Sequence, residues 1–141
     1  MSSPSPANRF RGRRIVVADE DPKVVEFIIK TLREDAFAVF HAYDGRSAIE
    51  LAYALDDEMH LVISNTRVDG LPGVQLIYEL RAWKPSLPIL YIANIDRSTP
   101  AIEAKLPRDV PILREPFTAE QLRAMVDSLL SGEPRALDIG G

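Results

Sequence analysis

The sequence predicts an α/β domain in which five parallel strands form one doubly wound sheet in the order 2-1-3-4-5, with helices on both faces. Three observations favour this fold class. Short apolar runs alternate along the chain with segments whose apolar residues recur at helical spacing. The runs are continuously apolar rather than alternating, which is typical of parallel strands buried on both faces. The length of 141 residues suits one domain with short tails.

The first half of the chain is expected to supply three strands and two helices. Asp21 and Pro22 provide an N-cap and a proline at the first helical position, so a helix begins there and extends to about Glu34. The remaining elements of this half are strands at Ile15–Ala18, Phe37–Ala42 and Leu61–Ser64, a turn at Asp44-Gly45, and a helix with the apolar stripe Ala48, Ile49, Ala52 and Leu55.

The second half is expected to alternate in the same way, with an irregular region before its last strand. Three prolines at positions 100, 107 and 111 leave room only for a short helix around Ala101–Leu106. Thr118 and Gln121 form a capping box ahead of the final helix. The other elements are a helix with the stripe Val74, Leu76, Ile77 and Leu80 that closes at Lys84-Pro85, and strands at Ile89–Ile92 and Ile112-Leu113.

Composition limits the domain organisation and the partners. The Ser-, Pro- and Arg-rich residues 1–12 are expected to be a disordered tail, residues 13–131 the folded domain, and residues 132–141 a C-terminal tail. The net charge of −4 does not indicate a nucleic-acid partner. The absence of cysteine excludes disulfides and zinc–thiolate sites. No apolar run approaches the ~18 residues of a membrane span, and no signal peptide is evident, so we expect a cytoplasmic protein.

The polar residues that follow the predicted strands are the candidate site. In doubly wound folds the ligand lies at the carboxyl ends of the strands, near the point where the strand order reverses. The residues at those ends are Asp19, Glu20, Asn65, Ala93, Asn94 and Glu115.

Taken together, four segments of the chain resemble the response-regulator receiver family. The resemblance covers about residues 14–130 and is carried by Ile15-Val-Val-Ala-Asp-Glu-Asp-Pro22, Leu61-Val-Ile-Ser-Asn65 with Gly70 and Gly73, Pro88-Ile-Leu-Tyr-Ile-Ala93, and Glu115-Pro116-Phe117. It implies the flavodoxin-like (βα)5 receiver fold of two-component phosphorelay signalling. In that family an aspartate at the end of the third strand takes phosphate from a histidine kinase. The resemblance also implies that the Glu115–Pro116 peptide bond is cis.

The chain departs from the family pattern where the chemistry takes place. Asn65 stands at the acceptor position, and a carboxamide is a poor nucleophile toward phosphorus. Ala93 replaces the hydroxyl residue that bonds the phosphoryl group, and Glu115 replaces the lysine that pairs with it. Ile112 occupies the position of the aromatic residue that turns inward. A degenerate site of this kind repels a phosphoryl dianion, so Asn65→Asp alone is not expected to restore phosphoryl transfer.

The resemblance places Asp19 and Glu20 where family members hold a divalent metal with an acidic pair. Mg²⁺ prefers such oxygen ligands, so one interpretation is a remnant site that binds Mg²⁺ weakly. The other is a polar loop with no cofactor required. Glu115 either accepts a hydrogen bond from the Asn65 amide or adds a ligand to a cation held by the acidic pair.

Our leading interpretation is a non-enzymatic, stand-alone pseudo-receiver that acts by phosphorylation-independent protein–protein interaction in bacterial signalling. The expected partner is a histidine kinase or a downstream target. The expected surfaces are Pro22–Glu34 and Ala101–Leu130, of which the second would also serve a homodimer. Two alternatives stay open: a working phosphorelay receiver with atypical acceptor chemistry, and a flavodoxin-like small-ligand binder. The acidic loop after the first strand disfavours the binding of a phosphate-bearing ligand.

Overall fold

The structure is a computed structural model that describes residues 8–132. Five parallel strands form one sheet in the order β2-β1-β3-β4-β5, which confirms the predicted topology. The strands are β1 (Arg14–Ala18), β2 (Ala38–Ala42), β3 (Met59–Asn65), β4 (Ile89–Ala93) and β5 (Ile112–Arg114). The helices are α1 (Pro22–Glu34), α2 (Gly45–Leu55), α3 (Gly73–Trp83), α4 (Pro100–Glu103) and α5 (Ala119–Ser131), with a 3₁₀ turn, η1, at Asp56–Glu58.

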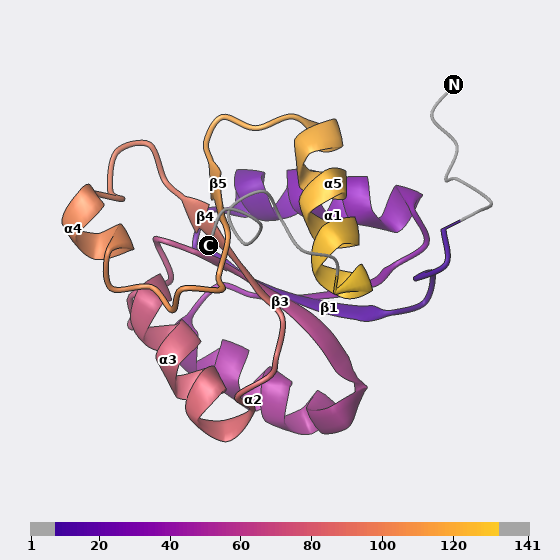
Figure 1. Cartoon of the computed structure of the whole chain (residues 1–141), viewed down its shortest axis with the longest axis horizontal. Helices are drawn as coiled ribbons and strands as arrows, with labels where there is room; N and C mark the ends of the chain where they lie inside the picture. Colours follow the sequence, from indigo (N-terminus) through magenta and orange to yellow (C-terminus); the bar gives the residue numbers. More distant parts are fainter. Residues whose placement is uncertain (1–7, 133–141) are drawn as a thin grey trace.

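Helices cover both faces of the sheet, as Figure 1 shows, with α2 and α3 on one face and α1 and α5 on the other. The residues of β1 alternate between the two layers. Val16 and Ala18 belong to the core cluster that contains α2 and α3, whereas Ile15 and Val17 belong to the cluster with α1 and α5. All four side chains are buried, and each large one contributes about 1.5–3 kcal/mol through burial. The sheet is therefore a rigid support for the residues at its carboxyl edge.

Helix caps follow the sequence signals. The Asp21 carboxylate accepts a hydrogen bond from the Lys23 backbone N–H, and the Thr118–Gln121 capping box is complete, so both predictions are confirmed. Asp44 and Gly45 were expected to form a turn. Asp44 instead caps α2 by accepting the Ser47 N–H, and the glycine is the first residue of that helix.

Four strands differ from the predicted bounds by one residue each, whereas two elements differ by more. The third strand extends beyond Leu61–Ser64 at both ends, because Met59 pairs with β1 and Asn65 pairs with β4. The short helix α4 ends at Glu103 rather than at Leu106. Its last turns tighten into 3₁₀-type bonds, since the Leu106 N–H donates to the Glu103 carbonyl.

The predicted tails fall mainly on residues 1–7 and 133–141, which lie outside the described residues. Residues 8–12, also assigned to the N-terminal tail, pack on the fold instead. Phe10 is buried in the core cluster of α1 and α5, and the Arg9 and Arg13 guanidinium groups lie over its ring. The Gly12 N–H donates to the Ala36 carbonyl. Within residues 8–132, no helix is long and apolar enough to cross a membrane.

Candidate functional site

The centre of the candidate site is the Asn65 carboxamide, which lies between two carboxylates. Asn65 is the last residue of β3, Asp19 follows β1 and Glu115 follows β5. Asn65 Nδ2 donates to Asp19 Oδ2 at 2.7 Å and to Glu115 Oε2 at 3.2 Å. An amide NH₂ carries two protons, so each carboxylate receives one. Of the two roles left open for Glu115, the structure shows the hydrogen bond from the Asn65 amide.

The other atoms of this centre are also engaged. Asn65 Oδ1 accepts the Arg67 backbone N–H at 3.1 Å, which fixes the NH₂ group toward the carboxylates. Asn94 Nδ2 donates to Glu115 Oε1 at 3.2 Å. The Glu115–Pro116 peptide bond is cis, as expected. Glu115 is therefore held by two neutral amides, and within residues 8–132 it forms no ion pair.

Asp19 is buried, with 1% of its surface exposed, and its environment favours the protonated form. Burial raises the pKa of Asp19 to about 7, and the Glu115 charge acts in the same direction. Hydrogen bonds from the Asp21 backbone and the Asn65 amide oppose this rise. The Asp19 carboxyl group is therefore partly protonated near neutral pH.

Glu20 points to a cation that the sequence interpretation missed. Its Oε2 lies 2.7 Å from the Arg67 guanidinium, and its backbone N–H donates to the Arg67 carbonyl at 3.0 Å. Arg67 lies two residues past β3, outside the positions compared with the family. Its position next to an acid-rich strand end was the only available signal. The Arg67 guanidinium therefore brings a positive charge to the acidic site.

These residues do not fit an Mg²⁺ site. Both Asp19 oxygens accept hydrogen bonds, Oδ1 from the Asp21 N–H and Oδ2 from Asn65, and Glu20 is paired with Arg67. Within the described part of the chain, no group of three or more His, Cys, Asp or Glu side chains is placed to hold a metal ion.

Gly73 allows α3 to approach the end of β3. A Cβ atom at this position would lie 1.9 Å from the Asn65 carbonyl oxygen, far inside contact distance. The Gly73 N–H donates to the Thr66 carbonyl at 3.3 Å, and its own carbonyl accepts from the Ser64 hydroxyl at 3.2 Å. This glycine therefore fixes the strand end that presents Asn65.

Ala93 and Ile112 lie at ends of neighbouring strands, next to a tyrosine on β4. Ala93 ends β4 and is buried, and Ile112 begins β5, half-buried and paired with Tyr91. The Tyr91 ring is fully buried. Its hydroxyl lies 2.7 Å from the Thr66 hydroxyl and 3.0 Å from the Ser98 hydroxyl.

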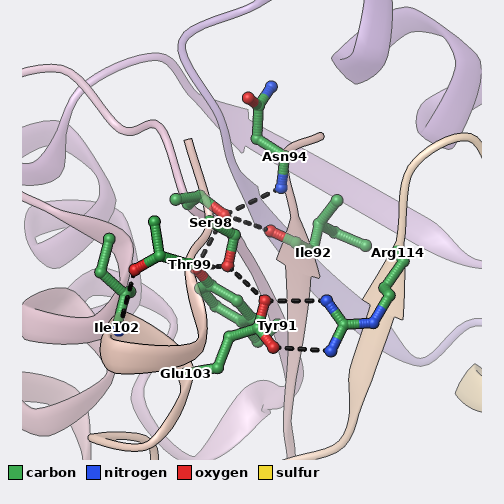
Figure 2. Close-up of polar contacts among 9 residues, drawn as sticks. Tyr91, Ile92, Asn94, Ser98, Thr99, Ile102, Glu103 and Arg114 are labelled. Atoms are coloured by element: carbon green, nitrogen blue, oxygen red, sulfur yellow. Dashed lines mark hydrogen bonds and ion pairs between the residues drawn. The ribbon is translucent and has the colours of Figure 1, made fainter. Parts of the chain in front are cut away.

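A hydrogen-bond network continues from Tyr91 to the surface of α4 and β5. Figure 2 shows Ser98 next to Tyr91, with Glu103 facing the Arg114 guanidinium. The Ser98 hydroxyl donates to Glu103 at 2.7 Å, and Arg114 binds both Glu103 oxygens at 2.8 and 2.6 Å. The Arg114 guanidinium, and then the Ser98 hydroxyl, lower the pKa of Glu103. The loop after β4 is thereby tied to β5.

Comparison with known proteins agrees with this geometry. Residues 15–127 match the sequence model of the response regulator receiver domain. The chain is 26% identical over 113 residues to the uncharacterized transcriptional regulatory protein YrkP of Bacillus subtilis (strain 168). The match covers 80% of this chain and 47% of that protein, so the chain spans about half the length of this curated relative.

Solved structures with the same fold include receiver proteins and receiver domains. A response regulator receiver protein from Sinorhizobium medicae WSM419 superimposes with a TM-score of 0.77 at 27% identity, over 87% of this chain and 98% of that one. A putative response regulator from Chloroflexus aurantiacus J-10-fl gives 0.74 at 20% identity, over 86% and 99% of the two chains. The signal receiver domain of a histidine kinase from Syntrophus aciditrophicus gives 0.76 at 21% identity, over 89% and 95%.

Proposed function

The chain belongs to the response regulator receiver domain family of two-component signalling, and we propose that it is a pseudo-receiver that acts without accepting phosphate. The observation that carries this proposal is the Asn65 amide, which donates to Asp19 and Glu115 together. In this role the protein is a cytoplasmic, non-enzymatic interaction module with no required cofactor. Its partner is a histidine kinase or a downstream target, contacted through α1 or through the surface of α4 and α5.

The chemistry of the centre supports the loss of phosphoryl acceptance. The acceptor step needs a carboxylate oxygen aimed at phosphorus, and at position 65 the group that faces the neighbouring carboxylates is a hydrogen-bond donor. A phosphoryl dianion entering this site would meet Glu115 instead of a cation. Two like unit charges at 4 Å repel by about 4 kcal/mol at an effective dielectric constant of 20. The site therefore opposes the charge that the reaction must stabilise.

The network around Tyr91 supports a surface that does not depend on phosphate. The Tyr91 hydroxyl, Ser98, Glu103 and Arg114 connect β4, α4 and β5 without involving the acceptor position. A bidentate ion pair with a buried hydroxyl behind it favours one arrangement of these elements. A partner that binds the surface of α4 and β5 would then contact the same arrangement whether or not phosphate is present.

The proposal is tested by amide NMR of the ¹⁵N-labelled protein. Mg²⁺ is added first, then beryllofluoride as a mimic of the phosphoryl group, and intact mass is recorded after incubation with acetyl phosphate. We expect no saturable shifts around Asn65, Ala93 and Glu115, and no added phosphate. A receiver that keeps its acceptor aspartate is the positive control. Saturable beryllofluoride shifts would instead support the working phosphorelay receiver and overturn the proposal.

A further inference from the structure

An apolar groove opens beside the acidic centre, between α1 and the segments that follow β4 and β5. Its walls include Phe27 of α1, Ile95 after β4 and Phe117 after β5, and Glu115 also lines it. The hollow has a volume of about 500 Å³. The Phe27 and Phe117 rings pack edge to face with centroids 5.8 Å apart. The groove is thus a formed surface feature with an aromatic wall.

The exposure of these side chains is unusual for the surface of this protein. Phe27 is 40% exposed and Ile95 is 68% exposed. In the described part of the chain the other exposed large hydrophobic residues are tyrosines, whose hydroxyl groups suit contact with water. The two residues that lack a hydroxyl both border this groove. Grouped apolar side chains of this kind typically mark an interaction site.

The charge beside the groove selects the partner. Glu115 is partly exposed, and the printed partners of its carboxylate are the neutral amides of Asn65 and Asn94. Lys23 also borders the groove, but within residues 8–132 no ion pair joins its ammonium group to Glu115. The Glu115 carboxylate is therefore left without a direct ion-pair partner. A cationic group entering the groove would supply it.

We propose that this groove docks a partner protein segment that presents a lysine or arginine beside a bulky apolar side chain. The apolar side chain packs against Phe27, Ile95 and Phe117, and the cation pairs with Glu115. The charge required is opposite to that of a phosphorylated histidine. This inference deepens the proposed function and rests on it, because it requires a site that does not take phosphate.

The first test uses two small probes of equal apolar length and opposite charge, n-hexylammonium and heptanoate, at matched ionic strength. Amide NMR titrations follow the residues that line the groove. We expect hexylammonium to shift Phe27, Ile95 and Phe117 saturably, with an affinity about fivefold higher than that of heptanoate. Equal affinities, a preference for heptanoate, or no saturable shifts at the groove would overturn the inference.

Three variants separate charge from apolar packing. Glu115→Gln keeps the shape of the side chain and should reduce the preference for hexylammonium to near unity. Phe27→Ser should weaken both probes alike. Tyr43→Ser is the matched control, because Tyr43 is 43% exposed and lies outside the groove, and it should change neither affinity. An unchanged preference in Glu115→Gln would overturn the assignment of the charge.

A display library of helical peptides then tests the partner chemistry directly. The wild-type protein should enrich sequences with Lys or Arg beside Leu, Phe or Met, and Glu115→Gln should lose the basic bias. Enrichment of acidic sequences would contradict the proposal. Failure here differs from failure of the proposed function. Saturable shifts with beryllofluoride would overturn the pseudo-receiver proposal itself. If beryllofluoride causes no shifts and the groove shows no preference for the cationic probe, only the docking inference is overturned.

Discussion

Replacing Asn65 by aspartate should destabilise the fold, although it restores the acceptor residue of the family. The new oxygen would face Asp19 Oδ2 at about the present 2.7 Å and Glu115 Oε2 at about 3.2 Å. Two hydrogen bonds to charged groups are lost, at about 1.5–3 kcal/mol each, and like charges replace them. We expect the free energy of unfolding to fall by about 3–5 kcal/mol at pH 8, a large part of the 5–15 kcal/mol typical of a domain.

The cost should depend on pH and on Glu115. The crowded carboxyl groups gain raised pKa values in the folded state, so the variant binds protons on folding and its deficit should shrink at pH 5. Urea unfolding at pH 5 and pH 8 measures both values. In a Glu115→Gln background, the cost of Asn65→Asp should be at least about 1 kcal/mol smaller, because one repelling charge is gone.

Asn94→Asp is the matched control for this experiment. Asn94 also donates to Glu115 at 3.2 Å, but it faces one carboxylate rather than two and is partly exposed. Its replacement should cost about 1–2 kcal/mol. If Asn65→Asp cost less than about 1 kcal/mol at pH 8, showed no dependence on pH, or matched Asn94→Asp, the bridging role of the amide would be refuted.

Three further predictions follow from the same geometry. The pKa of Asp19 rises from 3.8 to about 7 on folding, so its stabilising contribution is full below about pH 4 and is lost as pH rises through about 7. Asp19→Asn should therefore flatten the dependence of stability on pH in this window, as measured by thermal unfolding at several pH values. Gly73→Ala should lower the free energy of unfolding in urea by about 1–3 kcal/mol, because the new Cβ would lie 1.9 Å from the Asn65 carbonyl oxygen of β3. Gly70→Ala should cost less, because a Cβ there meets no atom within 4 Å and only the positive φ opposes it. Tyr91→Phe should cost about 1 kcal/mol in the same assay and weaken amide protection in the loop after β4, because the hydroxyls of Thr66 and Ser98 lose a partner; unchanged protection there would argue against the network.

The topology could be predicted because short segments of the sequence carry the signals for each strand and helix. Every residue of Ile15–Ala18 is apolar and buried, so the run predicts a central parallel strand without further information. The helix starts were equally local, since a cap such as Asp21 acts on an N–H two residues away. The third strand was predicted too short because His60 is polar. Its Nδ1 accepts the Arg14 N–H at 2.9 Å, a pairing that only the folded sheet provides.

The site could be predicted only in part. The family pattern located Asn65, Ala93 and Glu115, because those positions end or directly follow strands. It gave no signal for Arg67, whose guanidinium pairs with Glu20 across two loops. The sequence placed Tyr91 only within the predicted strand Ile89–Ile92, since the partners of its hydroxyl lie after β3 and after β4. Contacts between loops depend on side-chain reach in three dimensions, which periodicity does not encode.

The substitutions at positions 65 and 115 are best understood as one unit. With Glu115 present, an aspartate at position 65 would place three carboxyl groups together, Asp19 among them. With Asn65 present, Glu115 gains a donor that also serves Asp19, so the amide satisfies both acids. Each substitution thus makes the other less costly, and reverting either one alone loses this compensation. Asn65 and Glu115 therefore stabilise each other through hydrogen bonding instead of stabilising an incoming anion. The Glu115 carboxylate, which forms no ion pair within residues 8–132, lines the apolar groove, where a cationic partner can reach it.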